Sequence, residues 1–588
     1  MGAVFPSFAA DRTISSDYAL TSDETVDGIL TVESGVTVDL NGYNLVVQGL
    51  AGGGTINFTN NDLTSPDPNG ERVTWSVKGT AQGAIQGGTP RNLFNNNYAR
   101  ANTDNSKRIL LKCDSHLPLA VDYDFGEGNE KTINMYKMYC GPWGNASTAK
   151  RGPKTWTFAG SNDKETWTTL DSRNSVTWAT DQETKSYTFN NSTAYRYYRI
   201  TVTAATATDY LEIVQLEYFD TSIRPELHVA VPQGEVSVNS TVAITGNVCL
   251  VADGLGEFVS AKAGQTYTGG TLLAAGKLTM DGVTASGLTL GTNGGAPVVF
   301  DYGGQSMQRN PADYLVTGSE VTLTNGTFWM SGGMSIRDST KIPSVLTIAK
   351  GATLCQSGEN VHIIDKNNGT ATVNVVGGTL GKTGGSTSSS YSYLQHASLN
   401  GRLNVNVTDG GVLTYSHILR ALCGGNIGTT PSLYMMFADS TFIVENGATL
   451  ALNSGADIGT GAVTVKSGGT LEVAQSGMAR LNGNLSLADG AALGFNFTQR
   501  GPAPVLAIAG DATLTVEGAV AVKISSANGL WPIGGEKVLT TCGGFNSEGV
   551  SVSLAAGAPS WVQDSLSVNA DGDIVIDVKP KGAMVSIR

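Results

Sequence analysis

Short apolar runs broken by glycine recur along most of this 588-residue chain. Within each run apolar and polar residues alternate, as in residues 345–348 (VLTI) followed by 351–354 (GATL). A period of two predicts β-strands, because successive side chains of a strand point to opposite faces. The same unit returns with changes at 442–450, 463–473 and 485–493, so these are internal repeats.

Each repeat is too short to bury a core by itself. Stacking removes this difficulty, because in a parallel β-helix every strand pairs with the equivalent strand one coil away. Glycine at the corners permits the positive φ angles that such bends need. Antiparallel hairpins are the alternative, since Ser-Gly and Asn-Gly steps also suit hairpin turns. We predict an all-β chain built mainly as a parallel β-helix, or solenoid.

Charge narrows the range of partners. The formal net charge is -13, and residues 71–220 hold 17 Lys and Arg against 16 Asp and Glu, so the acidity belongs to the repeats. An acidic surface repels nucleic-acid phosphates and anionic membranes, which leaves neutral glycans, glycoproteins or other proteins as partners. No apolar run approaches the roughly 18 residues of a membrane span, so membrane insertion is not expected.

The N-terminal residues point to export. Residues 7–10 (SFAA) before Asp11 are typical of the small-residue end of a secretory signal. The sequence therefore predicts a secreted, extracellular or cell-surface protein.

Residues 71–220 interrupt the repeats. Five of the eight Trp and ten of the nineteen Tyr fall there, and the glycine-punctuated units are few. We therefore interpret this segment as a separate domain inserted at one corner of the β-helix, where insertions are tolerated. The predicted organisation is N-terminal coils over 1–70, the insert over 71–220, and the main β-helix with a C-terminal cap over 221–588.

The insert resembles discoidin domains, the superfamily of coagulation-factor type C domains and family 32 carbohydrate-binding modules. The segments that carry the resemblance are 121–126 (VDYDFG), 131–136 (KTINMY), 153–163 (PKTWTFAGSND) with Trp167, 195–199 (YRYYR) and 211–218 (LEIVQLEY). The resemblance implies a jelly-roll β-sandwich whose ligand-binding loops cluster at one end. The flanking repeats, notably 265–278 (QTYTGGTLLAAGKL), resemble bacterial autotransporter-associated repeats.

The discoidin resemblance raises the question of a structural calcium ion. Members of the family often hold one with a Phe-Asp-Gly-Asn loop and a Glu in the last strand. Here Phe94 is followed by Asn95, Asn96 and Asn97, and Gln215 stands in place of the Glu, so two formal charges are missing. Oxygens of Asn95, Asn97 and Gln215 could still bind calcium weakly. No other cofactor is expected, because the six cysteines show no close metal-binding spacing.

Sugar recognition needs an aromatic face and a few planar polar groups. Residues 141–151 (GPWGNASTAKR) supply Trp143 to stack on a sugar, and Asn145 and Arg151 to bind its hydroxyls. Tyr98 and His116 lie on loops that could converge on the same end. The alternative for Trp143 is packing within its own loop. Three further tryptophans, in or next to predicted strands, are assigned to the core: Trp156, Trp167 and Trp178.

Catalysis is not expected. The solenoid acids stand singly beside turns, and the five histidines show no paired spacing: His116, His228, His362, His396 and His417. The predicted function is that of an adhesin-like surface protein, which binds glycans through the insert displayed on a β-helix stalk. The alternative is a structural or filament-forming protein in which the insert mediates subunit contacts and self-association. A polysaccharide-degrading enzyme is a third interpretation, on fold analogy alone.

Overall fold

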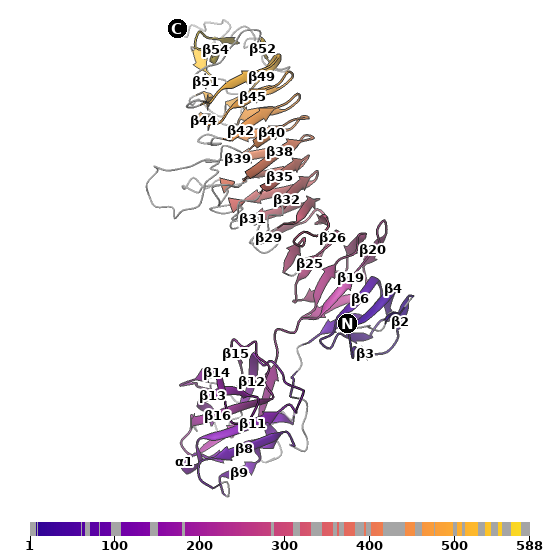
Figure 1. Ribbon diagram of the computed structural model, residues 1–588, viewed down its shortest axis with the longest axis vertical. Helices are drawn as coiled ribbons and strands as arrows, with labels where there is room; N and C mark the ends of the chain where they lie inside the picture. The colour runs from indigo at the N-terminus through magenta and orange to yellow at the C-terminus, as the bar shows by residue number, and fades with distance from the viewer. Residues whose placement is uncertain are drawn as a thin grey trace, which may run out of the picture. The chain divides into compact units, whose positions relative to one another are not determined.

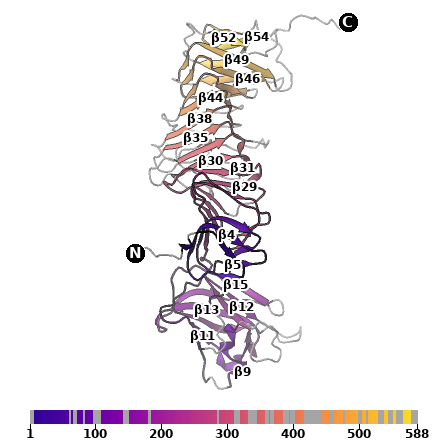
Figure 2. The ribbon, with the colours of Figure 1, turned by 90° about the vertical axis from the view of Figure 1, so that its right-hand side faces the viewer.

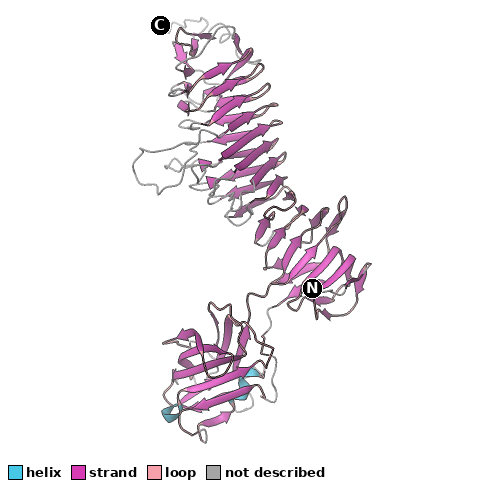
Figure 3. Ribbon diagram, viewed as in Figure 1, coloured by secondary structure: helices cyan, strands magenta, loops and turns pink. Residues whose placement is uncertain are grey.

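The computed structural model describes residues 7–8, 10–59, 62–64, 71–80, 83–95, 108–140, 151–178, 183–283, 287–309, 318–330, 344–356, 362–363, 370–382, 393–394, 402–415, 441–452, 461–474, 477–497, 503–508, 512–526, 536–542, 551–554 and 566–577. The prediction of an all-β chain is confirmed. Apart from the short helices η1 (Pro90–Phe94) and α1 (Cys113–His116), the described elements are strands (Figure 3). No helix among these residues is long and apolar enough to cross a membrane.

The chain forms two compact units. Unit 1 comprises Met1–Phe58 together with Pro225–Arg588, and unit 2 comprises Thr59–Arg224. Unit 2 extends beyond the predicted 71–220 at both ends. At its start, the Asp62 carboxylate accepts the Tyr218 N–H at 2.8 Å, and the Leu63 N–H donates to the Tyr218 carbonyl at 2.8 Å. Residues 62–64 therefore belong with the last strand of the insert.

Unit 1 consists mainly of parallel sheets whose neighbouring strands come from successive repeats (Figure 1 and Figure 2). One sheet has the order β1 (Ser7–Phe8), β4 (Glu24–Val32), β6 (Leu45–Gly52), β19 (Glu226–Val229), β22 (Cys249–Ala252), β25 (Thr271–Leu273) and β27 (Leu288–Leu290), with β2 (Arg12–Ile14) also on β4. A second has the order β24 (Thr266–Tyr267), β21 (Ala243–Gly246), β7 (Thr55–Phe58), β5 (Thr37–Asp39) and β3 (Tyr18–Ala19).

Two longer parallel sheets follow. The first has the order β20 (Val236–Asn239), β23 (Glu257–Ser260), β26 (Gly276–Met280), β28 (Val298–Asp301), β30 (Glu320–Thr324), β32 (Ser344–Ala349), β35 (Thr370–Val376), β38 (Arg402–Thr408), β40 (Thr441–Val444), β42 (Ala462–Val465), β45 (Leu485–Leu487) and β48 (Leu514–Val516). The second has the order β29 (Ser306–Arg309), β31 (Gly326–Met330), β33 (Ala352–Gln356), β36 (Thr379–Lys382), β39 (Val412–Tyr415), β41 (Thr449–Leu452), β43 (Thr470–Val473), β46 (Ala492–Phe497), β49 (Ala519–Ser526) and β52 (Ser551–Leu554).

Three small sheets complete unit 1. Two are parallel, β34 (His362–Ile363) with β37 (Tyr393–Leu394), and β44 (Gly477–Leu481) with β47 (Pro504–Ile508) and β51 (Thr540–Cys542). The third is antiparallel and has the order β50 (Glu536–Val538), β54 (Ile574–Asp577) and β53 (Leu566–Val568).

The core of unit 1 is a set of apolar columns. In the longest sheet, equivalent inward positions pair along consecutive strands, and each of these side chains is at most 3% exposed: Leu346, Val373, Val405, Phe442, Val463 and Leu485. Alternation within one repeat selects the inward face, and the parallel register repeats it from strand to strand.

An Asn-Gly step shows how the repeats turn. Asn446 and Gly447 have φ angles of 54° and 77°, the left-handed region that glycine enters at low cost. They connect β40 to β41, which belong to different sheets, so the step makes a corner and not a hairpin. The Gly447 N–H donates to the Gly468 carbonyl at 3.0 Å, and the Gly468 N–H to the Gly490 carbonyl at 3.0 Å. Equivalent corners are thus hydrogen-bonded to one another.

Unit 2 leaves unit 1 after β7 and returns before β19. Leu227 of β19 pairs with Leu45 of β6, and Ile244 of β21 pairs with Ile56 of β7. Both ladders of unit 1 therefore continue across the insertion.

Unit 2 is built from antiparallel sheets arranged as in a sandwich. A five-stranded sheet has the order β14 (Thr168–Arg173), β13 (Pro153–Ser161), β16 (Tyr197–Ala205), β11 (Leu119–Asp124) and β8 (Val73–Val77). Two three-stranded sheets have the orders β15 (Glu183–Thr188), β12 (Met135–Cys140), β18 (Gln215–Phe219), and β17 (Tyr210–Ile213), β10 (Ile109–Lys112), β9 (Ile85–Gly88). All three sheets contribute to one aromatic-rich core.

Candidate functional site

Loops of unit 2 meet at one end of the sandwich. The Lys78 N–H, after β8, donates to the carbonyl of His116 in α1 at 3.1 Å. At the start of α1, the Cys113 N–H donates to the Asp209 carbonyl at 2.9 Å, and the Thr206 N–H of the same β16–β17 loop donates to the Gly152 carbonyl at 2.9 Å. Backbone hydrogen bonds thus join four segments: the β8–β9 loop, α1, the β16–β17 loop and the approach to β13. We call this region the loop end.

Arg151 is held in place at the loop end. Its Nη2 lies 2.7 Å from Asp209 Oδ2, and its guanidinium carbon lies 4.7 Å from the centroid of the Tyr210 ring. Burial alone would raise the pKa of Asp209, but the Arg151 hydrogen bond, the Tyr210 N–H and the Arg151 charge together outweigh it and hold that pKa below its usual value. An ion pair and an aromatic contact together restrict the guanidinium to one orientation.

His116 closes α1 at the same end. Its Nδ1 lies 3.4 Å from the Lys78 carbonyl oxygen, and the side chain is partly exposed. The structure therefore brings two of the five predicted ligand-binding residues, His116 and Arg151, into one hydrogen-bonded group of loops. The other three, Tyr98, Trp143 and Asn145, lie outside the described residues.

The residues predicted for calcium are not all described. Asn95 follows η1, and its N–H donates to the Asn92 carbonyl at 3.4 Å. Gln215 is completely buried in β18, and its Nε2 donates to the Leu216 carbonyl at 3.4 Å. Asn97 lies outside the described residues.

The described part of this donor set offers calcium no charged ligand. Asn95 and Gln215 supply only neutral oxygens, and nowhere in the described part of the chain do three His, Cys, Asp or Glu side chains come together in a metal-binding arrangement. Calcium favours carboxylate ligands, which these two residues do not provide.

A buried ion pair next to the loop end was missed from the sequence. Arg108 Nη1 lies 2.8 Å from Glu212 Oε1, and the two side chains are 4% and 3% exposed. The Glu212 N–H donates to the Arg151 carbonyl at 2.8 Å, so this strand also fixes the Arg151 backbone. Burial raises the pKa of Glu212, and Arg108 opposes that rise. A single Glu within an apolar strand is the sequence signal for this ion pair. Its partner, Arg108, lies 104 positions away, so no local pattern indicates it.

The assignment of Trp167 to the core is wrong. Trp156 and Trp178 are 1% and 5% exposed and belong to the core, whereas Trp167 lies partly exposed outside it. Arg199 of β16 places its guanidinium carbon 3.9 Å from the centroid of the Trp167 ring. Lys164, with a φ of 64°, is part of the β13–β14 turn that carries Trp167 to this position.

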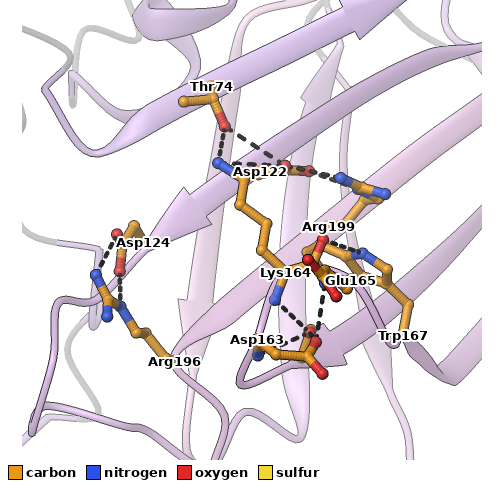
Figure 4. Close-up of polar contacts among 10 residues, drawn as sticks. Thr74, Asp122, Asp124, Asp163, Lys164, Glu165, Trp167, Arg196 and Arg199 are labelled. Atoms are coloured by element: carbon orange, nitrogen blue, oxygen red, sulfur yellow. Dashed lines mark hydrogen bonds and ion pairs between the residues drawn. The ribbon is translucent and has the colours of Figure 1, made fainter.

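Figure 4 shows the charged network around Trp167. Arg199 donates to both oxygens of Asp122, at 2.6 and 2.9 Å, and the Lys164 ammonium donates to Thr74 Oγ1 at 2.8 Å. Beside them, Arg196 makes a paired contact with Asp124 at 2.9 and 3.1 Å. Each of these charged groups has a partner within the network. The network therefore acts as a frame that fixes the β13–β14 turn to the sheet.

Comparisons with known proteins identify structural neighbours of part of the chain. No protein-family model matches the chain, and no curated protein matches it. Solved structures that match include the CBM32-5 module of CpGH89 from Clostridium perfringens in complex with GalNAc-β-1,3-galactose, at 15% identity and a TM-score of 0.20, over 26% of this chain and 97% of that one. The CBM32 of AlyQ in complex with 4,5-unsaturated mannuronic acid matches at 20% identity and a TM-score of 0.19, over 25% and 95% of the two chains.

A third neighbour is the family 32 module of NanJ from Clostridium perfringens in complex with galactose. It matches at 14% identity and a TM-score of 0.19, over 26% of this chain and 96% of that one. The neighbours are thus carbohydrate-binding modules, each matching about a quarter of this chain.

Proposed function

We propose that unit 2 is a jelly-roll carbohydrate-binding module that binds glycans at the loop end. The observation that carries the proposal is Arg151, fixed between Asp209 and the Tyr210 ring where several loops are hydrogen-bonded together. A restricted guanidinium offers planar donors to sugar hydroxyls at a lower entropic cost than a mobile one. The Asp209 side chain is 52% exposed, so its carboxylate can accept hydroxyl hydrogens.

We further propose that unit 1 is a parallel β-helix that carries this module as a stalk. Parallel ladders between equivalent strands of successive repeats, and corners hydrogen-bonded to one another, support this architecture. With the predicted export segment, the proposal makes the chain a secreted or cell-surface adhesin. The resemblance of the repeats to autotransporter-associated repeats remains a prediction.

Binding without catalysis is part of the proposal. Some acids of unit 1 form surface ion pairs with lysines, such as Glu445 with Lys466 at 2.8 Å and Glu257 with Lys277 at 3.0 Å. A glycosidase needs two carboxylates that flank one bond. Paired surface acids of this kind are typical of a solvated scaffold.

The test is a glycan array with the full chain and its Arg151→Ala variant. We expect the variant to bind about ten- to a hundredfold more weakly, since hydrogen bonds to charged groups contribute about 1.5–3 kcal/mol. Arg173→Ala is the matched control. Arg173 also pairs with an aspartate at 2.7 Å and lies 4.9 Å from a tyrosine ring, but it is in β14, outside the loop end. Equal loss in both variants, or no binding by the folded parent chain, would contradict the proposal.

A further inference from the structure

The longest sheet of unit 1 changes chemistry along its outward face. On β23 and β26 the outward side chains include a charged pair, with the Lys277 ammonium 3.0 Å from Glu257. The row that contains Lys277 continues strand by strand to Thr347 of β32, in the register of the parallel ladder. From Thr347 onward, amides, hydroxyls and a few aliphatic groups take the place of the charges.

Two rows of outward side chains cross the middle strands of this sheet, which follow one another in Figure 1. We call these two rows the ladder face. All of its side chains are uncharged and partly exposed: Thr347, Asn374, Asn406, Ile443, Thr464 and Ser486 in one row, and Val345, Thr372, Asn404, Thr441 and Ala462 in the other. Equivalent positions repeat at the strand spacing of about 4.8 Å. The face is therefore a regular, uncharged array of mainly hydrogen-bonding groups.

Side-chain hydrogen bonds hold several of these groups in place. Asn406 Nδ2 donates to Asn374 Oδ1 at 2.8 Å, and Asn374 Nδ2 donates to Thr347 Oγ1 at 3.3 Å. In the other row, the Thr441 hydroxyl donates to Asn404 Oδ1 at 3.1 Å. A primary amide has two N–H donors and an oxygen with two lone pairs, so each asparagine keeps hydrogen-bonding capacity beyond these contacts. Groups fixed in this way lose little entropy when a ligand binds.

We propose that the ladder face binds a neutral polysaccharide whose extended chain lies across the strands. Charge complementarity selects this ligand, because an uncharged face offers an ionic group no counter-charge, and burying an unpaired charge is costly. The amides and hydroxyls match sugar hydroxyls, and Ile443 and Val345 offer aliphatic surface to the sugar rings. This site lies in unit 1 and goes beyond the function proposed for the loop end of unit 2.

The regular repeat favours a polymer over a compact sugar or a protein. In an extended β-linked glycan, each sugar unit advances the chain by a distance close to the strand spacing, so successive sugars can meet successive strands. Stable protein interfaces depend on aromatic or arginine anchors, and the ladder face carries none. A second copy of this chain is therefore a poorer fit, and its binding is an outcome of the experiment.

The experiment measures binding of neutral polysaccharides to the full chain carrying Arg151→Ala, in which the loop-end site is weakened. The probes are mannan, galactan, xylan and β-glucan, each as short and as long oligomers. We expect one of these polymers to bind. Its long oligomers should bind at least about tenfold more tightly than its short ones, because each further sugar adds hydrogen bonds of about 1 kcal/mol.

Lysine variants test the ladder face directly. Thr464→Lys, added to the Arg151→Ala chain, places a charged side chain on the path of the polymer, and binding should fall at least about tenfold. Thr289→Lys is the matched control, because Thr289 is also outward and partly exposed but lies in β27 of another sheet. Asn406→Ala removes one amide and should weaken binding about fivefold. Circular dichroism of each variant checks that it is folded.

The outcomes separate this site from the loop end. Polysaccharide binding that Arg151→Ala leaves intact and Thr464→Lys removes would support the ladder face, whether or not the loop end binds a glycan. Loss of all polysaccharide binding with Arg151→Ala alone, equal effects of the two lysine variants, or no binding of any long polymer would overturn it. Dimers of the parent chain that Thr464→Lys dissociates in sedimentation velocity would also overturn it, and would assign the face to a second copy.

Discussion

The two units bury apolar residues in different ways. In unit 1, aliphatic side chains form columns in which each residue meets its equivalents in the neighbouring repeats, as Leu450 does between Leu413 and Leu471. In unit 2, aromatic residues distant in sequence meet in one cluster, as Phe158 does with Tyr136 at 4.7 Å and with Tyr218 at 5.1 Å. Stability in unit 1 is therefore a sum of local terms, whereas unit 2 depends on a single shared core.

This difference also separates scaffold from site. The loops at the loop end of unit 2 follow strands that rest on the shared core, so damage to the core should reach these loops. In unit 1 the described ladders join equivalent strands of successive repeats, so damage there should remain local.

The largest effect is expected for Trp156→Ala in unit 2. Trp156 is 1% exposed, and its Nε1 donates to the Tyr136 hydroxyl at 2.7 Å. Removing the ring should destabilise unit 2 by about 4 kcal/mol, because large core truncations leave cavities. Hydrogen exchange measured by mass spectrometry on the full chain should show faster exchange throughout unit 2, loops included, and unchanged exchange in unit 1.

Trp167→Ala is the control for that prediction. The Trp167 ring is partly exposed, lies outside the core and contacts Arg199. Its removal should destabilise unit 2 by about 1 kcal/mol, because it removes a single cation–π contact. If both tryptophan variants destabilised unit 2 equally, the division between its core and its charged frame would be wrong.

A smaller and more local effect is expected for Leu450→Ala in unit 1. Leu450 is completely buried in β41. The substitution should destabilise unit 1 by about 3 kcal/mol. The resulting increase in hydrogen exchange should be confined to β39, β41 and β43. Thr449→Ala, on the outward face of the same strand, should change exchange little. Faster exchange as far away as β4 and β6 would show that unit 1 unfolds as one cooperative body instead.

The sequence predicted periodic features well and long-range pairing poorly. Strict alternation identified the inward positions of the repeats, because burial on one face of a strand leaves a period of two. It could not decide between a corner and a hairpin at Asn446 and Gly447, since both use positive φ angles. Whether the step forms a corner or a hairpin depends on which sheet the next strand joins. The packing of the whole repeat determines that sheet.

The candidate site shows the same limit. Arg151 and His116 were predicted from their residue types on loops, and the hydrogen bonds through Asp209 and Lys78 that join those loops were not. Trp167 was assigned to the core because a tryptophan beside a strand usually packs inward. The β13–β14 turn instead carries it under Arg199, a partner 32 positions away that no local pattern indicates.

The smallest effect is expected for the pH dependence of unit 1. His228 of β19 has both ring nitrogens against carboxylates, with Nδ1 2.7 Å from Asp253 and Nε2 2.9 Å from Glu226. Burial alone would lower the pKa of His228, but the two carboxylates outweigh it and raise the pKa above its ordinary value. The protonated ring therefore stabilises the fold below about pH 6.5, and this contribution is lost as the pH rises through the raised pKa.

The measurement is chemical denaturation of the full chain across that pH range, with hydrogen exchange to assign the change to unit 1. Between pH 6 and pH 9 the coils around β19 and β22 should lose about 1 kcal/mol of stability. His228→Gln cannot take up a proton, so it should remove this pH dependence and leave unit 2 unaffected. If stability depended on pH in the same way in the parent chain and in the variant, the two carboxylates would not hold a protonated His228. Because β19 is the first strand after the insert, a loss confined to its neighbours would show that even the re-entry point of unit 1 behaves as one more local coil.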